Sequence, residues 1–294
     1  MTAATITAGV AAGPERVGLA RLYRAELRWI FRRPRTLVVL GLLALVPAVI
    51  GIGLAVANSS GFGPSDGTQA GDGGNGLLSS AAGNALVLPI AALAVTLNLL
   101  LPLTTAMSAG DALAGESANG TLRGWLLAPV SRGRLLLVKS LGVATFTLAA
   151  TVLMAVVGVI TGLIINGTGS LFTLTGTTLS FGEALGKIAV AAAWVTLQLW
   201  AVGAVALAIS ACTEHPMLVV VSVLAGTIVS AVLLLLSAVD WLHPFLLPRS
   251  WDSITDILRD PMPTTGLAEG ALRAACYVVI GLSLAYARIT TKDG

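Results

Sequence analysis

The sequence predicts an all-α integral membrane protein. It has six transmembrane helices, an N-terminal amphipathic helix at the membrane interface and short re-entrant-like helices before the last span. Of the 294 residues, 56% are hydrophobic and only 11% are charged, whereas an ordinary soluble domain is about a quarter charged. The apolar residues form long runs without two-residue alternation, which favours membrane helices over a β-barrel.

Six apolar runs are long enough to cross a hydrocarbon core of about 30 Å, which takes about 20 helical residues. They are Leu37–Ala57, Ala85–Met107, Leu135–Ile165, Ala184–Ala211, Met217–Val239 and Leu267–Ala287. The first run is not expected to be a cleaved signal peptide, because it is too long and 36 residues precede it.

The positions of lysine and arginine predict the orientation of the spans. Seven arginines precede the first span, and more lie between the second and third spans and in the tail. The first two outer loops, 58–83 and 166–182, contain none, and only the segment 241–266 breaks the pattern. Both termini are therefore expected to be cytoplasmic, with residues 1–36 before the transmembrane domain, which spans 37–288, and 289–294 after it.

An amphipathic helix is predicted over Val17–Arg33. At 100° per residue, Arg21, Arg24 and Arg28 fall on one face and the apolar side chains cover the other. Such a helix lies in the interface with its arginines toward anionic headgroups. The alternative is a positive anchor with no mechanical role.

Glu26 lies on the apolar side of this helix and has no basic neighbour one turn away. A carboxylate near the headgroup boundary requires a partner. We hypothesise an ion pair with a distant base, for which Arg123 is one choice, although Glu26 could instead be solvated by headgroup water.

The outer segment 241–266 is rich in tryptophan, proline and aspartate and contains an amphipathic stretch, Ser253–Leu258. These features indicate short helices in the outer interface with tryptophans at headgroup depth. A plain interfacial loop is the alternative.

The sequence contains no recognisable set of catalytic residues. The string Gly182–Ile188 resembles a phosphate loop, but its glycine spacing is one residue short and isoleucine replaces the hydroxyl that would bind Mg²⁺. His215 and His243 have no partners at metal or triad spacing, and Cys212 and Cys276 are expected to be free thiols. We therefore expect no enzyme activity, no metal site and no cofactor in this chain.

The most informative segment, Gly110–Leu135, lies between the second and third spans. It contains an acid, then Gly-Thr-Leu at 120–122, then Leu-Leu-Ala-Pro-Val-Ser-Arg at 126–132. This pattern resembles the membrane subunits of ABC-2 type transporters, in particular the drug-resistance, daunorubicin-exporter-like branch. The resemblance extends to the six spans, the N-terminal helix and the elaborated outer segment.

The resemblance implies that a coupling helix, at about 115–128, docks in a cleft of a separate ATP-binding subunit. Glu116 favours the N-terminus of such a helix, and Pro129 ends it. The residues implied in coupling are Glu116, Gly120, Thr121, Leu122, Arg123, Trp125 and Pro129. An ordinary basic cytoplasmic loop is the alternative.

The resemblance also implies that the second and fifth helices line a path between two membrane subunits. Polar side chains on these helices are candidates for that path: Thr96, Asn98, Ser222 and Thr227. Hydrogen bonding between helices, without substrate contact, is the alternative.

The function implied is the permease subunit of an ABC exporter in the bacterial inner membrane, with a mostly apolar path that suits a lipophilic drug or lipid. Its expected partners are an ATP-binding subunit that uses ATP and Mg²⁺, an identical or related second permease subunit, and membrane lipids, but no nucleic acid. A non-transporting assembly or sensing factor on the same scaffold is the main alternative. An intramembrane enzyme is disfavoured because the catalytic residues are missing.

Overall fold

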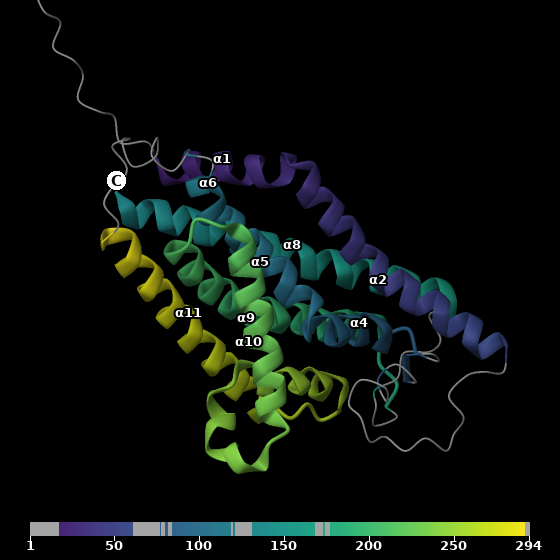
Figure 1. The fold of residues 1–294 in the computed structure, drawn as a ribbon. Helices are drawn as coiled ribbons and strands as arrows, with labels where there is room; N and C mark the ends of the chain where they lie inside the picture. Colours follow the sequence, from purple (N-terminus) through teal and green to yellow (C-terminus); the bar gives the residue numbers. More distant parts are fainter. Residues whose placement is uncertain are drawn as a thin grey trace, which may run out of the picture.

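The computed structural model describes residues 18–60, 77, 80–81, 84–118, 120, 131–167, 173 and 177–291. Its regular elements are all helical, as predicted (Figure 1). Five described helices are long and apolar enough to cross a membrane, and a bent pair of helices that passes the same test together is the candidate for a sixth span. The five are α2 (Pro34–Ser59), α8 (Arg132–Asn166), α9 (Phe181–Cys212), α10 (Pro216–Leu234) and α11 (Thr265–Thr291). The all-α membrane fold is confirmed.

The bent pair is α4 (Val87–Leu97) with α5 (Leu100–Ala112), and the two axes differ by 59°. The chain breaks at Asn98 and Leu99, one turn before Pro102. Proline has no N–H for the carbonyl four residues earlier, and its ring crowds that carbonyl. For Pro102 that carbonyl belongs to Asn98, so the sequence itself accounts for the position of the bend.

The interfacial helix α1 (Leu19–Arg32) lies across one end of the bundle (Figure 1). Pro34 begins α2, which runs at an angle to α1 because the intervening Arg33 is extended. The short helix α6 (Ala114–Ala118) lies beside α1 at the same end (Figure 1). This end of the bundle also holds the start of α8 and the end of α11.

The opposite end carries two 3-10 helices, η1 (Ser237–Phe245) and η2 (Leu247–Leu258). The predicted fifth span, Met217–Val239, is too long, since α10 ends at Leu234 and the chain turns into η1. The turn is held by the His243 ring, whose Nε2 lies 2.9 Å from the Leu233 carbonyl oxygen.

The two tryptophans of this outer segment differ. Trp241 is 72% exposed, as expected for headgroup depth, but Trp251 is only 4% exposed. Trp251 lines a groove with residues of α9, α10 and α11. The expectation of interfacial tryptophans is therefore wrong for Trp251, because η2 packs its apolar face onto the bundle instead of presenting it to lipid.

Glycines allow two pairs of helices to approach closely. A Cβ at Gly158 of α8 would lie 2.7 Å from Pro89 Cα, and a Cβ at Gly162 would lie 2.7 Å from the Ala85 carbonyl oxygen. A Cβ at Gly281 of α11 would likewise meet Ala204 of α9 at 2.7 Å. Small residues at such contacts let van der Waals packing hold membrane helices together.

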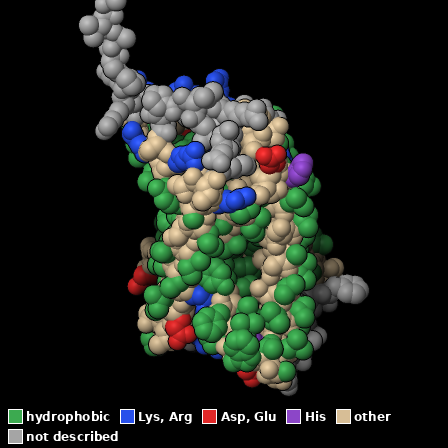
Figure 2. Space-filling model, turned by 60° about the vertical axis from the view of Figure 1, so that its left-hand side comes forward, with side chains coloured by type: hydrophobic (Ala, Val, Ile, Leu, Met, Phe, Trp, Pro, Cys, Tyr) green, Lys and Arg blue, Asp and Glu red, His purple; other side chains and the backbone are tan. Residues whose placement is uncertain are grey.

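The surface shows where lipid can lie. On the face drawn in Figure 2, apolar side chains cover a broad zone in the middle of the molecule, and basic side chains gather above it at the α1 end. Acidic and a few basic side chains lie below this zone. An apolar middle between two charged ends is typical of a membrane-spanning bundle.

Candidate functional site

Three buried charged side chains meet at the α1 end of the bundle. The Lys139 ammonium of α8 donates to both carboxylate oxygens of Glu26 of α1, at 3.0 and 2.9 Å, and also to the Glu116 carboxylate of α6. Their exposed fractions are 1% for Lys139 and 6% for each glutamate. We call these residues the ionic triad. It joins three elements that are far apart in the sequence.

Helix geometry explains why the triad forms. Glu26 and Ile30 lie one turn apart on α1 and both are buried. Both side chains lie against Gly142 of α8. A Cβ added at Gly142 would meet the Ile30 side chain at 3.0 Å and the Glu26 side chain at 3.1 Å. The absent side chain at Gly142 lets α1 sit directly on α8, and Lys139, one turn before Gly142, then faces Glu26.

Glu116 belongs to a helix that is fixed to the bundle by further bonds. The Ala114 N–H donates to Ser210 Oγ of α9 at 2.9 Å, and that hydroxyl donates to the Gly110 carbonyl at 3.4 Å. Burial raises the pKa of Glu116, and the Lys139 ammonium opposes that rise. The segment that follows α5 is thus held by α8, α9 and α1 together.

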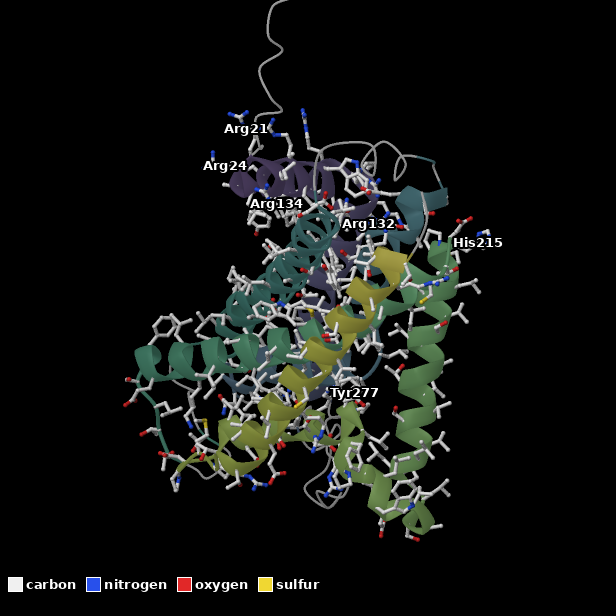
Figure 3. The ribbon with its side chains drawn as sticks, turned by 90° about the vertical axis from the view of Figure 1, so that its left-hand side faces the viewer. Arg21, Arg24, Arg132, Arg134, His215 and Tyr277 are labelled. Atoms are coloured by element: carbon white, nitrogen blue, oxygen red, sulfur yellow. The ribbon has the colours of Figure 1, made fainter. Side chains whose placement is uncertain are left out.

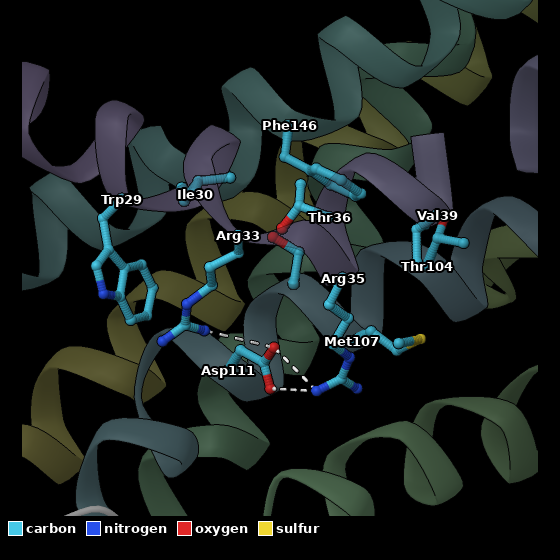
Figure 4. A pocket seen from close by; sticks show the side chains of 11 residues that line it. Trp29, Ile30, Arg33, Arg35, Thr36, Val39, Thr104, Met107, Asp111 and Phe146 are labelled. Carbon is cyan, nitrogen blue, oxygen red and sulfur yellow. Dashed lines mark hydrogen bonds and ion pairs between the residues drawn. The ribbon is translucent and has the colours of Figure 1, made fainter. Parts of the chain in front are cut away.

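A second charged cluster lies near the triad, since Arg33 and Lys139 both approach the Trp29 ring. Figure 4 shows the members of this cluster. Asp111 at the end of α5 accepts from Arg35 at 3.3 and 3.4 Å and pairs with Arg33 at 3.7 Å. The Arg33 guanidinium also stacks on Trp29, 3.2 Å from the ring centroid. These contacts fix the corner between α1 and α2 to the end of α5, and so to the end of the bent span.

The predicted coupling residues are only partly within the described chain. Glu116 points inward to Lys139, and Gly120 has a positive φ of 70°, a backbone conformation that favours glycine. The remaining ones lie outside the described residues: Thr121, Leu122, Arg123, Trp125 and Pro129. The hypothesised pairing of Glu26 with Arg123 is therefore untested, and the base that the structure places beside Glu26 is Lys139.

The predicted path residues are not in one place. Thr96 is 4% exposed, and its hydroxyl donates to the Ala92 carbonyl at 2.7 Å and faces Met154 of α8. Asn98 is exposed at the bend of the α4–α5 span. Ser222 and Thr227 line a groove of about 200 Å³ between α10 and its neighbours α9, η2 and α11.

On the interfacial helix, Arg21, Arg24 and Arg28 are exposed, while Glu26 is buried. Lys139 was not predicted to be a site residue, because its charge was noted only as lying just beyond the basic loop between the second and third spans. The signal was present: Lys139 lies four residues inside a predicted span, and the residues one turn before and after it are apolar. Charges at such depth usually have partners.

Taken together, the fold and the ionic triad define a polytopic α-helical membrane subunit whose first loop helix is tied to an interfacial helix. The family model for ABC-2 family transporter proteins matches residues 20–259. The chain therefore belongs to the ABC-2 transporter family, whose permeases are transport subunits and generally work with an ATP-binding subunit. A comparison with curated protein sequences finds no match.

Proposed function

We propose that this chain is the permease subunit of an ABC exporter of the drug-resistance, daunorubicin-exporter-like type, in the bacterial inner membrane with both termini cytoplasmic. A separate ATP-binding subunit drives it, using ATP and Mg²⁺. Two permease subunits, identical or related, form the path. The cargo is a lipophilic drug or lipid.

The observation that best supports this proposal is the ionic triad. A cytosolic ATP-binding subunit can move a membrane helix only through a rigid element that contacts both the subunit and the helix. The helix α6 leads from the bent span α4–α5 into the proposed coupling segment, and Glu116 fixes α6 to α1 and α8 through Lys139. A displacement of that segment would therefore be passed to the interfacial helix and to two spans.

The test is reconstitution of the full chain in vesicles with its ATP-binding subunit. We expect ATP hydrolysis to require this chain and to rise when lipophilic compounds are added. A complex that forms but shows no hydrolysis dependent on this chain and no transport would instead support the alternative, an assembly or sensing factor.

We also propose that Asn98, at the exposed bend, lies at the seam between two permease subunits, with Ser222 and Thr227 along the same path. Thr96 faces α8, so it contributes to the path by holding the bend. With the exposed Cys212 and Cys276 replaced by serine, the prediction is that Asn98→Cys reacts with a polar thiol reagent in one nucleotide state and is protected in another. Cysteine at position 154, a buried α8 position beside Thr96, is the control and should stay unreactive. Equal protection of position 98 in every nucleotide state would remove it from the path.

A further inference from the structure

An apolar groove lies on the outside of the bundle, between α8, α9 and α11. It encloses about 260 Å³, and its lining residue Thr145 contacts α1 through the Tyr23 hydroxyl. Three small residues line it, Ala144 of α8 and Gly203 and Ala204 of α9. The larger apolar residues that line it are Leu141, Leu148, Trp200, Leu207, Val278 and Leu282. This apolar lining suits an acyl chain.

The groove ends at polar and basic side chains near α1. Thr145 lines the groove, and its hydroxyl lies 2.6 Å from the Tyr23 hydroxyl of α1, so α1 crosses the top of the groove. Arg24 follows Tyr23 and is exposed. Arg134 lies seven residues, or two helical turns, before the lining residue Leu141, so it shares the groove side of α8. Figure 3 shows Arg24 on α1 and Arg134 on α8 at the same end of the molecule.

We propose that this groove is a binding seat for an anionic phospholipid. One acyl chain lies in the groove against Trp200, and the phosphate lies between Arg24 and Arg134, near the hydroxyls of Tyr23 and Thr145. Charge complementarity selects the anionic headgroup, since a basic side chain near a membrane surface attracts anionic lipid. The seat bridges α1 to three spans and does not depend on the proposed transport activity.

A second groove on the same helices provides the contrast. It encloses about 430 Å³ between α8 and α9 and shares Leu148 with the first. Its lining is apolar and runs toward the outer end, through Ile160 and Leu185. Lys187 donates to the carbonyls of Ile257 and Arg259, so its charge lies at the end of η2. This outer groove should accept any acyl chain without selecting a headgroup.

The experiment measures contact between lipid chains and Trp200, which is 40% exposed. Full-length protein is reconstituted in phosphatidylcholine vesicles that contain either phosphatidylglycerol or phosphatidylcholine with brominated chains, which quench tryptophan on contact. The Trp200 contribution is the quenching lost in Trp200→Phe. We expect a phosphatidylglycerol preference of about fivefold for each arginine, as about 1 kcal/mol of attraction for each base implies.

Two pairs of variants separate the seat from ordinary lipid contact. Arg24→Gln with Arg134→Gln should abolish the preference, whereas Arg32→Gln with Arg288→Gln, which removes equal charge from the same end, should keep it. Ala144→Phe should fill the groove and reduce Trp200 quenching by both lipids, whereas Ala193→Phe, in the outer groove, should leave it unchanged. Equal quenching of wild-type Trp200 by the two brominated lipids, or equal losses of preference in the two arginine pairs, would overturn the proposal.

Discussion

Replacing Lys139 with methionine should lower the free energy of unfolding by about 3–5 kcal/mol, because it leaves two buried carboxylates without their shared cation. Glu26 and Glu116 are each 6% exposed, so water cannot replace the lost ammonium. Thermal unfolding of the detergent-solubilised protein, followed by tryptophan fluorescence, measures the change. The matched control is Arg35→Met, which breaks an ion pair whose arginine is 52% exposed and should cost under about 1 kcal/mol.

The stability lost in Lys139→Met should depend on pH in a defined direction. Burial raises the pKa of Glu116 in the folded protein, so the folded state holds this proton more tightly than the unfolded state. Stability therefore falls as the pH rises from the ordinary carboxyl pKa through the raised one. Lys139 is the main group that opposes this rise in pKa, so Lys139→Met should be most destabilising above that interval and least destabilising below it.

Neutralising both carboxylates as well should rescue the variant. The triple variant Glu26→Gln, Glu116→Gln, Lys139→Met has no buried charge in the triad and should regain most of the stability that Lys139→Met loses, because that loss comes from uncompensated buried carboxylates. If Lys139→Met unfolds at the wild-type temperature, or its loss is the same at every pH, the triad is not the electrostatic link described above.

The sequence predicts the bundle well because the cost of exposing polar backbone to lipid leaves few choices. The spans along α2, α8, α9 and α11 were predicted to within a few residues. The end of α10 was predicted too late in the chain, because Leu235–Val239 is as apolar as the helix before it. The turn depends on His243 reaching back to the Leu233 carbonyl, which is a tertiary contact.

The ionic triad was also predicted only in part, because it too depends on tertiary contacts. The amphipathic pattern placed Glu26 on the buried side and so required a partner for it. The identity of that partner depends on where α1 crosses α8, and Glu26 and Lys139 are 113 residues apart. No local pattern specifies that crossing, although the glycine at position 142 permits it. The inward orientation of Glu116 is likewise set by packing against α8 and α9.

Charged substitutions at Leu122 and Trp125 should uncouple ATP hydrolysis from transport. Both residues lie in the proposed coupling segment, and their three-residue spacing would place them on one apolar face of the predicted helix. Leu122→Asp with Trp125→Asp would place two carboxylates where an apolar contact with the ATP-binding subunit is expected. We expect substrate-stimulated hydrolysis and transport by the reconstituted complex to fall at least about tenfold, since losing even 1.4 kcal/mol of contact energy is a factor of ten in binding.

The ionic triad makes this experiment more specific. Glu116→Gln keeps the shape of α6 and leaves Lys139 paired with Glu26, so it should weaken the link to the bundle without altering the apolar face. If the two regions form one mechanical path, Glu116→Gln should preserve binding of the ATP-binding subunit but reduce transport per ATP, whereas the Leu122 and Trp125 variant should lose binding itself. Transport and binding at wild-type levels in the Leu122 and Trp125 variant would show that the motor acts elsewhere, and Glu116 would then serve only to hold α6 in place.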